Sequence, residues 1–154
     1  MLIKETALVR LLGLKIPVLL FLGPTVERLD DEGCAVGIAL GLRSRNHLGS
    51  MYFGALCAGA DLAAGLNAAR LIWFHGHRDV QLVFKDVKAE FLKRADGDVR
   101  FETRQGLAVK EAVLRAESSG ERELVPMEVV ATVPKKYGDE PVARFTMGLA
   151  LKRK

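Results

Sequence analysis

Cysteine is scarce in this sequence: only Cys34 and Cys57 occur, and both lie in apolar or glycine-rich surroundings. Neither belongs to a Cys-x-x-Cys pair or to a cysteine and histidine spacing typical of zinc, so we expect no metal, no cofactor and no disulfide framework. His75 and His77 are close in sequence, but no carboxylate or cysteine cluster accompanies them, and a turn that ends a helix is the preferred interpretation. A reducing cytoplasm is the expected compartment.

Aromatic residues and net charge are also low. Aromatics make up 6% of the chain, the formal net charge is +4, and the only dense basic cluster is Lys152–Lys154. Without a basic face that carries stacking side chains, a nucleic-acid partner is not expected. Lys15 and Pro17 interrupt the apolar run near the N-terminus. The run is shorter than the roughly 20 residues of a membrane-spanning helix, so neither a membrane partner nor a signal peptide is expected.

The 154 residues suffice for one domain with its own core, and we expect a single domain over residues 1–154. A helix is predicted over Leu2–Leu12, ended by Gly13, with Leu2, Leu8, Leu11 and Leu12 as its apolar surface. The other predicted elements are strands over Val26–Leu29 and Cys34–Leu42, a long helix over Met51–Trp73, a hairpin of two strands within 80–104 joined by Ala-Asp-Gly-Asp, a helix over Leu107–Glu117, and two final strands over Val125–Val133 and Ala143–Leu151. This order predicts the α+β class, with an antiparallel sheet wrapped around one long central helix.

One acid stands out in the predicted central helix. Asp61 lies too far inside the helix to act as an N-cap, and its neighbours in sequence are alanine and leucine. If it is buried, the carboxylate is unpaired within its helix, which is costly, raises its pKa and is usually tolerated only at a site that uses it. Two alternatives stay open: an exposed stripe shared with Asn67, or an ion pair with an arginine of another strand.

The segment NHLGSMYFGALCAGADLAAG, which begins at Asn46, resembles the motif of the hotdog-fold thioesterases, in the branch of PaaI-like and thioesterase-like bacterial proteins. In that family the motif is Asn, a few residues, Gly-[Ser/Thr]-x-His-Gly-Gly and, at the seventh residue after the last glycine, an Asp or Glu on the central helix. The matching positions here are Asn46, Gly49, Ser50, Gly54 and Asp61. The register holds, but Tyr52 stands where the family has histidine, and Phe53 replaces the first glycine.

The resemblance implies a thioesterase site on the central helix, with Asp61 as general base or nucleophile. The helix start at Tyr52, Phe53 and Gly54 would offer backbone N–H groups and the positive end of the helix dipole to a carbonyl that becomes an oxyanion. Tyr52 is no base near neutral pH, since its ordinary pKa is about 10, so it would donate a hydrogen bond or pack at a dimer seam.

Four further residues are candidates for substrate binding: Asn46, His47, Ser50 and Arg94. His47 lies in the predicted loop before the central helix and could equally be a turn or surface residue. Arg94, with Lys88 and Lys93, lies where family members often meet the phosphates of coenzyme A. A solvated basic edge is the simpler interpretation of these three cations.

Helix geometry constrains the assembly. Nine helical residues place Tyr52 and Asp61 on the order of 13 Å apart, too far to act on one carbonyl carbon. A two-fold dimer with antiparallel central helices would bring Asp61 of one protomer to the Tyr52 end of its partner, as in hotdog dimers. We therefore expect a homodimer or a dimer of dimers.

The sequence thus predicts an enzyme, an acyl-CoA thioesterase in which Asp61 assists attack of water at a dimer-interface site. The alternative is a non-catalytic hotdog protein that binds an acyl-thioester or an aromatic ligand, since Tyr52 and Phe53 depart from the family motif. A hydratase or dehydratase of the same fold ranks last, because no histidine follows Asp61 closely.

Overall fold

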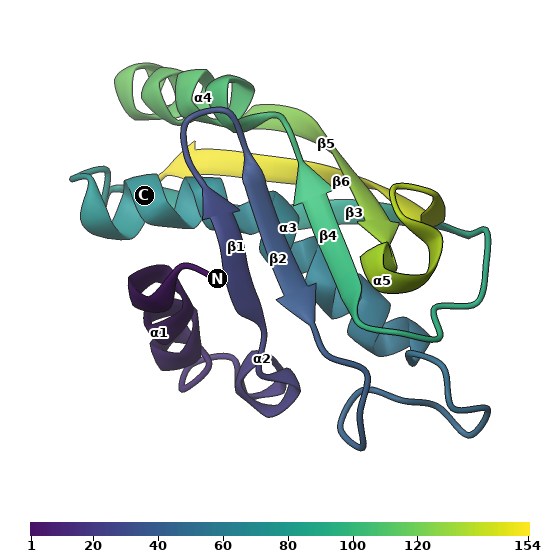
Figure 1. Ribbon diagram of the computed structural model, residues 1–154. Helices are drawn as coiled ribbons and strands as arrows, with labels where there is room; N and C mark the ends of the chain where they lie inside the picture. Colours follow the sequence, from purple (N-terminus) through teal and green to yellow (C-terminus); the bar gives the residue numbers. More distant parts are fainter.

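The computed structural model describes residues 1–154 and contains one antiparallel six-stranded sheet that curves around a long helix (Figure 1). The strand order across the sheet is β1-β2-β4-β5-β6-β3. In chain order the elements are α1 (Ile3–Leu12), α2 (Pro17–Leu22), β1 (Thr25–Leu29), β2 (Cys34–Ile38), α3 (Phe53–Phe74), β3 (Val80–Phe91), β4 (Val99–Thr103), α4 (Gly106–Ser119), β5 (Glu123–Thr132), α5 (Pro134–Tyr137) and β6 (Pro141–Arg153). The predicted fold class, α+β with a wrapped central helix and an N-terminal helix, is confirmed.

The central helix α3 is apolar on nearly all sides because the sheet surrounds it. Alanine and leucine make up half of its 22 residues, and 14 of the 22 are buried. A helix that is apolar all round is typical of a protein core. Its length and composition would also suit a membrane span, but most of it is covered by the domain itself. Gly59 lets it approach β4 closely: a Cβ there would lie 2.3 Å from the ring of the fully buried Phe101.

Helix α1 docks on the outer edge of β1. The amide of Val26 donates to Oγ1 of Thr6 at 2.9 Å, and the carbonyl of Val26 accepts from the amide of Leu2 at 2.6 Å. Part of the β1 edge is therefore satisfied by the N-terminal segment. The predicted helix is confirmed, but its buried residues are Thr6 and Val9, and Leu11 is 63% exposed.

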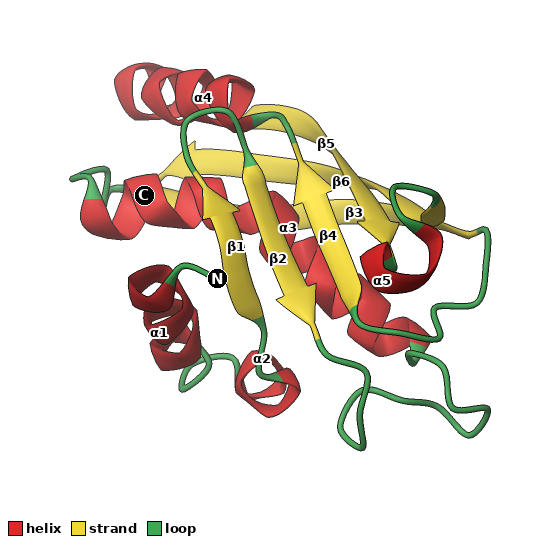
Figure 2. Cartoon of the chain, viewed as in Figure 1, coloured by secondary structure: helices red, strands yellow, loops and turns green.

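A second short helix, α2, was not predicted. Pro17 occupies its first turn, where the missing amide costs nothing, and Gly23 ends it with a positive φ of 60°. With α1 it forms a helical hairpin beside β1 and the far end of α3 (Figure 2). This N-terminal hairpin becomes important at the candidate site.

The predicted hairpin within 80–104 is wrong. Both strands exist, but β3 pairs with β6, whereas β4 pairs with β2 and β5. The connection at 92–98 is a crossover held by tertiary contacts: Asp96 accepts a hydrogen bond from the Tyr137 hydroxyl at 3.0 Å, and Gly97 packs against Val133. The Asp-Gly pair therefore serves this packing and not a tight two-residue turn.

Strand β2 ends earlier than predicted, at Ile38 and not at Leu42. The hydroxyl of Ser44 donates to the carbonyl of Ala39 at 2.7 Å and accepts from the amide of Gly41 at 3.0 Å. This buried serine turns the chain out of the sheet and begins the long connection to α3. The remaining predicted helices and strands are present, with small shifts of their ends.

Candidate active site

Asp61 lies in the middle of α3, on a stripe that also contains Phe53, Cys57 and Gly65 at four-residue spacing. Its carboxylate is partly buried, and no ion pair or hydrogen bond within the chain involves it. Burial alone raises the pKa of the Asp61 carboxyl above its ordinary value. Both open alternatives are excluded, because no arginine pairs with Asp61 and Asn67 is only 2% exposed.

The Asp61 carboxylate borders an apolar cavity of about 70 Å³, which we call the Asp61 slot. The slot lies between α3, β3 and the N-terminal hairpin. Along α3 its lining extends from Asp61 through the next three turns to Trp73. Asp61 is its only charged residue. The lining residues are Leu12, Ile16, Leu19, Asp61, Leu62, Gly65, Leu66, Ala69, Trp73, Leu82 and Phe84.

The start of α3 offers uncapped backbone amides. Tyr52 occupies the N-cap position, and no side chain caps the helix. The first amides of a helix have no intrahelical partner, so those of Phe53 and Gly54 are available to an electronegative atom. The Tyr52 ring packs over Gly54, where a Cβ would lie 2.4 Å from Cε1 of the ring. Tyr52 and Phe53 are 49% and 59% exposed, so this helix start is open to solvent.

The loop before α3 is braced by two of the predicted substrate-binding residues. Oδ1 of Asn46 accepts from the amides of Leu48 at 2.9 Å and Ser50 at 3.2 Å, and Nδ2 of Asn46 donates to the Ser50 hydroxyl at 3.2 Å. Ser50 is buried, whereas His47 is exposed at the loop tip. These contacts give Asn46 and Ser50 a structural part in presenting the helix start.

The predicted basic group lies on the 92–98 crossover and on β3. Lys93 pairs with Glu140 at 2.7 Å, Lys88 pairs with Glu90 at 3.3 Å, and Arg94 is exposed. Elsewhere, Nδ1 of His77 lies 2.8 Å from the Glu117 carboxylate and links the end of α3 to α4.

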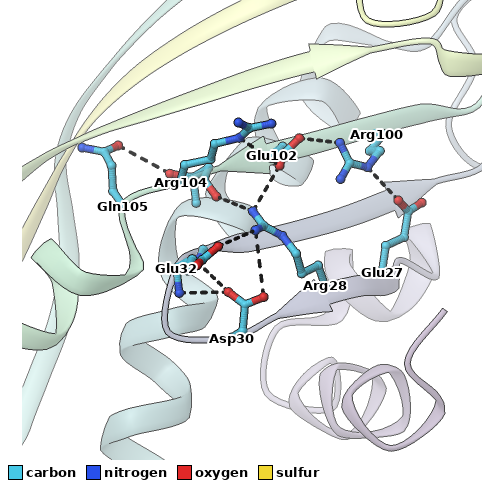
Figure 3. Close-up of polar contacts among 10 residues, drawn as sticks. Glu27, Arg28, Asp30, Glu32, Arg100, Glu102, Arg104 and Gln105 are labelled. Carbon is cyan, nitrogen blue, oxygen red and sulfur yellow. Dashed lines mark hydrogen bonds and ion pairs between the residues drawn. The ribbon is translucent and has the colours of Figure 1, made fainter.

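A charged network covers the outer face of β1, β2 and β4 (Figure 3). Arg28 reaches Glu102 at 3.1 Å, and Arg100 contacts both Glu102 and Glu27. Partial burial favours the neutral acid, but the hydrogen bond and charge of Arg100 outweigh it and lower the pKa of Glu102. The carboxylates of this network are paired with arginines, whereas that of Asp61 has no such partner, so the network is structural.

The two thiols are poor nucleophiles in the folded chain. Burial raises the pKa of Cys34 to about 12 and also raises that of Cys57, one helical turn before Asp61. Because the thiolate is the reactive form, neither cysteine supplies a nucleophile at neutral pH. Within the stripe, the carboxylate of Asp61 is the group that can accept a proton.

Within one chain, the predicted catalytic residues form two separate groups on the same helix. Tyr52, Phe53 and Gly54 lie at its start, and Asp61 lies about 13 Å further along the axis. The slot lining from the N-terminal hairpin and Trp73 was not predicted. The sequence did contain a signal for the second helix of this hairpin: Pro17 begins an apolar hexapeptide and Gly23 follows it, which is the usual placement of these residues at the two ends of a helix.

Comparison with known protein structures supports the α+β fold with a wrapped central helix described above. A Pseudomonas aeruginosa protein of unknown function, described as a probable thioesterase, is 24% identical with a TM-score of 0.76 over 95% of this chain and 93% of its own. A Chlorobaculum tepidum protein of unknown function gives 13% identity and a TM-score of 0.81, with coverages of 98% and 95%. A mutant thioesterase of Pseudomonas aeruginosa is 14% identical with a TM-score of 0.66, over 98% of this chain and 94% of its own. No protein with a curated description matches the sequence.

At these identities the structural likeness shows the fold alone, and that fold is the one that the resemblance to hotdog thioesterases predicts. The family model that matches describes a domain of unknown function, DUF4442, and covers residues 4–150. The chain therefore belongs to the DUF4442 family and has the hotdog fold.

Proposed function

We propose that the protein is a thioester hydrolase that acts on an acyl-CoA, with Asp61 as the general base. One observation carries the proposal: an unpaired carboxylate borders an apolar slot. An unpaired, partly buried carboxylate lowers the stability of the fold, so a chemical use would account for its presence. The apolar lining suits an acyl group and excludes bulk water. Thioesterases among the structural neighbours support the reaction class.

We further propose that two protomers complete the site by pairing along β3. Of the two edge strands of the sheet, β1 is partly covered by α1, whereas β3 presents a 12-residue edge. Val83, Val87 and Phe91 along it are 52–59% exposed. A long apolar edge strand is normally paired or protected. A second copy, joined antiparallel about a two-fold axis, would cover it.

This pairing brings the two groups of residues together. The Phe53 ring packs on Phe91, with centroids 6.4 Å apart, so the start of α3 lies at the Phe91 end of β3. Leu82 and Phe84, which line the Asp61 slot, lie in the other half of the strand. Antiparallel pairing sets the Phe91 end of one β3 beside the Val80 end of the other. The uncapped amides of one protomer then approach the slot of its partner.

The reaction follows from these positions. The carboxylate of Asp61 takes a proton from a water molecule while the water oxygen attacks the thioester carbonyl carbon. The carbonyl oxygen gains negative charge, which the Phe53 and Gly54 amides of the other protomer stabilise. Collapse of the intermediate breaks the carbon–sulfur bond, the coenzyme A thiolate takes the proton from Asp61 and restores its carboxylate, and the carboxylic acid is released. No metal or cofactor takes part.

The alternative is a non-catalytic protein that binds an acyl-thioester or an aromatic ligand. The exposed rings of Tyr52 and Phe53 at the helix start favour it, because these two residues replace a histidine and a glycine of the family motif. Incubation with a panel of acyl-CoA esters and a thiol-detecting dye separates the two. Thiol release that depends on enzyme concentration supports hydrolysis, whereas binding without release supports the alternative.

We expect the protein in a reducing cytoplasm, with both cysteines free.

A further inference from the structure

A second hollow of about 660 Å³ adjoins the Asp61 slot, and we call it the basic recess. Its lining comes from the end of α1, the end of α3, the first half of β3 and the C-terminal residue. Leu12, Trp73 and Leu82 line both hollows, so the recess continues the slot at the end remote from Asp61. Its lining residues are Leu12, Lys15, Ile72, Trp73, Arg78, Val80, Gln81, Leu82, Val83 and Lys154.

Three cations from distant parts of the chain meet in the basic recess. Lys15 lies between α1 and α2, Arg78 follows α3, and Lys154 follows β6. No aspartate or glutamate lines the recess, whereas the cations on the outer sheet face are paired with carboxylates. Three cations that share a concave surface lined by no aspartate or glutamate attract an anion, and low-dielectric walls strengthen that attraction.

We propose that the basic recess is an anion-binding site for the end of the ligand remote from the thioester. The proposal rests on the proposed function, which places the thioester at Asp61. Asp61 and Trp73 are 12 residues apart on α3, which places the thioester and the recess roughly 18 Å apart along the helix axis. A ligand that extends along the slot brings its far end to Arg78 and Lys15.

Two parts of an acyl-CoA could supply the anion: the phosphates of coenzyme A, or a carboxylate at the free end of the acyl chain. The lining of the slot favours the carboxylate. The pantetheine arm carries amides and a hydroxyl, which would lose hydrogen bonds among leucine, alanine and phenylalanine side chains. A hydrocarbon chain loses none. The favoured substrates are therefore thioesters of acyl groups with a terminal carboxylate.

Trp73, the only tryptophan of the chain, lines both hollows and reports binding by its fluorescence. Four ligands are titrated into the protein, and their affinities are compared in two pairs. One pair is dodecanoyl-CoA and its counterpart with a terminal carboxylate, and the other is coenzyme A and dephospho-coenzyme A. The titrations use the parent, Arg78→Gln, Lys15→Gln and the control Arg122→Gln, which removes the same charge from an exposed position outside the recess. A charge-assisted contact predicts roughly tenfold tighter binding of the carboxylated ester, lost in both recess variants and kept in the control.

The two sources of the anion give different patterns. If Arg78→Gln removes the preference for coenzyme A over dephospho-coenzyme A instead, the recess binds phosphate. Equal affinities within both ligand pairs, unchanged in the recess variants, overturn the site altogether. Hydrolysis is measured separately in the same samples. Selective binding without thiol release would refute the thioesterase proposal and leave the anion site standing.

Discussion

Phe53 and Phe91 pack edge to face, with their ring centroids 6.4 Å apart and an interplanar angle of 78°. The contact fixes the start of α3 to one end of β3, the long edge strand. A dimer joined along β3 would use this contact to place the uncapped amides of one protomer at the partner's slot. Assembly and chemistry are therefore linked in this account.

The assembly is tested first. We expect light scattering to give at least twice the chain mass of 16.9 kDa at micromolar concentration. Val87→Lys, near the middle of β3, should produce monomers, because two lysines would face each other across the two-fold axis. The control Leu42→Lys alters an 83% exposed loop residue and should leave the assembly intact. A monomeric parent, or equal effects of both variants, would contradict β3 pairing.

Two glycines of α3 are predicted to respond oppositely to alanine. A Cβ at Gly59 would lie 2.3 Å from the buried Phe101 ring, so Gly59→Ala should lower the free energy of unfolding by about 1–3 kcal/mol. At Gly65 a Cβ would lie 3.4 Å from Phe84, an ordinary contact, and alanine should raise stability by up to about 1 kcal/mol. Urea unfolding measures both changes. A stabilising Gly59→Ala would show that α3 and β4 are less tightly packed than described.

Tyr52→Phe should lower the rate of hydrolysis by less than about tenfold, since the lost hydroxyl can donate only one hydrogen bond and backbone amides remain. The control is Tyr137→Phe, which removes the 3.0 Å hydrogen bond to Asp96 and should reduce stability without changing the rate. Steady-state kinetics with one acyl-CoA compares them. A loss for Tyr52→Phe as large as that for Asp61→Asn would make the tyrosine hydroxyl essential.

Stability should depend on pH through Asp61. Burial raises the pKa of its carboxyl in the folded state above the value of about 3.9 in the unfolded chain. Between these two values the folded state holds more protons, so stability falls as pH rises through that interval and stays lower above it. Asp61→Asn removes this loss. Its Tm should match that of the parent below about pH 4 and exceed it at neutral pH. An Asn variant that melts lower at neutral pH would indicate a stabilising ion pair in solution.

Local patterns account for what was predictable in the fold. The alanine-rich run of α3 reflects a helix that is buried on nearly all sides. The strict alternation of apolar residues in β5 and β6 reflects strands that are buried on one side, and all three elements were predicted. The Asp96–Gly97 pair misled because the same residues that form tight turns also permit close packing, here against Val133. That packing depends on contacts distant in sequence.

At the candidate site, the sequence singled out Asp61 and the start of α3, but the apolar slot was not foreseen. Leu12, Ile16 and Leu19 reach it only because the N-terminal hairpin docks on β1 through Thr6 and Val26. A single hydroxyl at position 6 gives no periodic signal. The basic recess was unforeseen for the same reason, since its cations come from three distant segments.

The most direct test of the account is the rate of thioester hydrolysis by Asp61→Asn. The amide keeps the shape of the side chain but accepts no proton from water, so the rate should fall on the order of 10²–10⁴-fold. Asp139→Asn, at an exposed position, is the matched control and should keep the parent rate. Light scattering and Tm should show that the Asp61 variant stays assembled and folded. A parent-like rate for Asp61→Asn on an acyl-CoA that the parent hydrolyses would contradict the proposed role of Asp61.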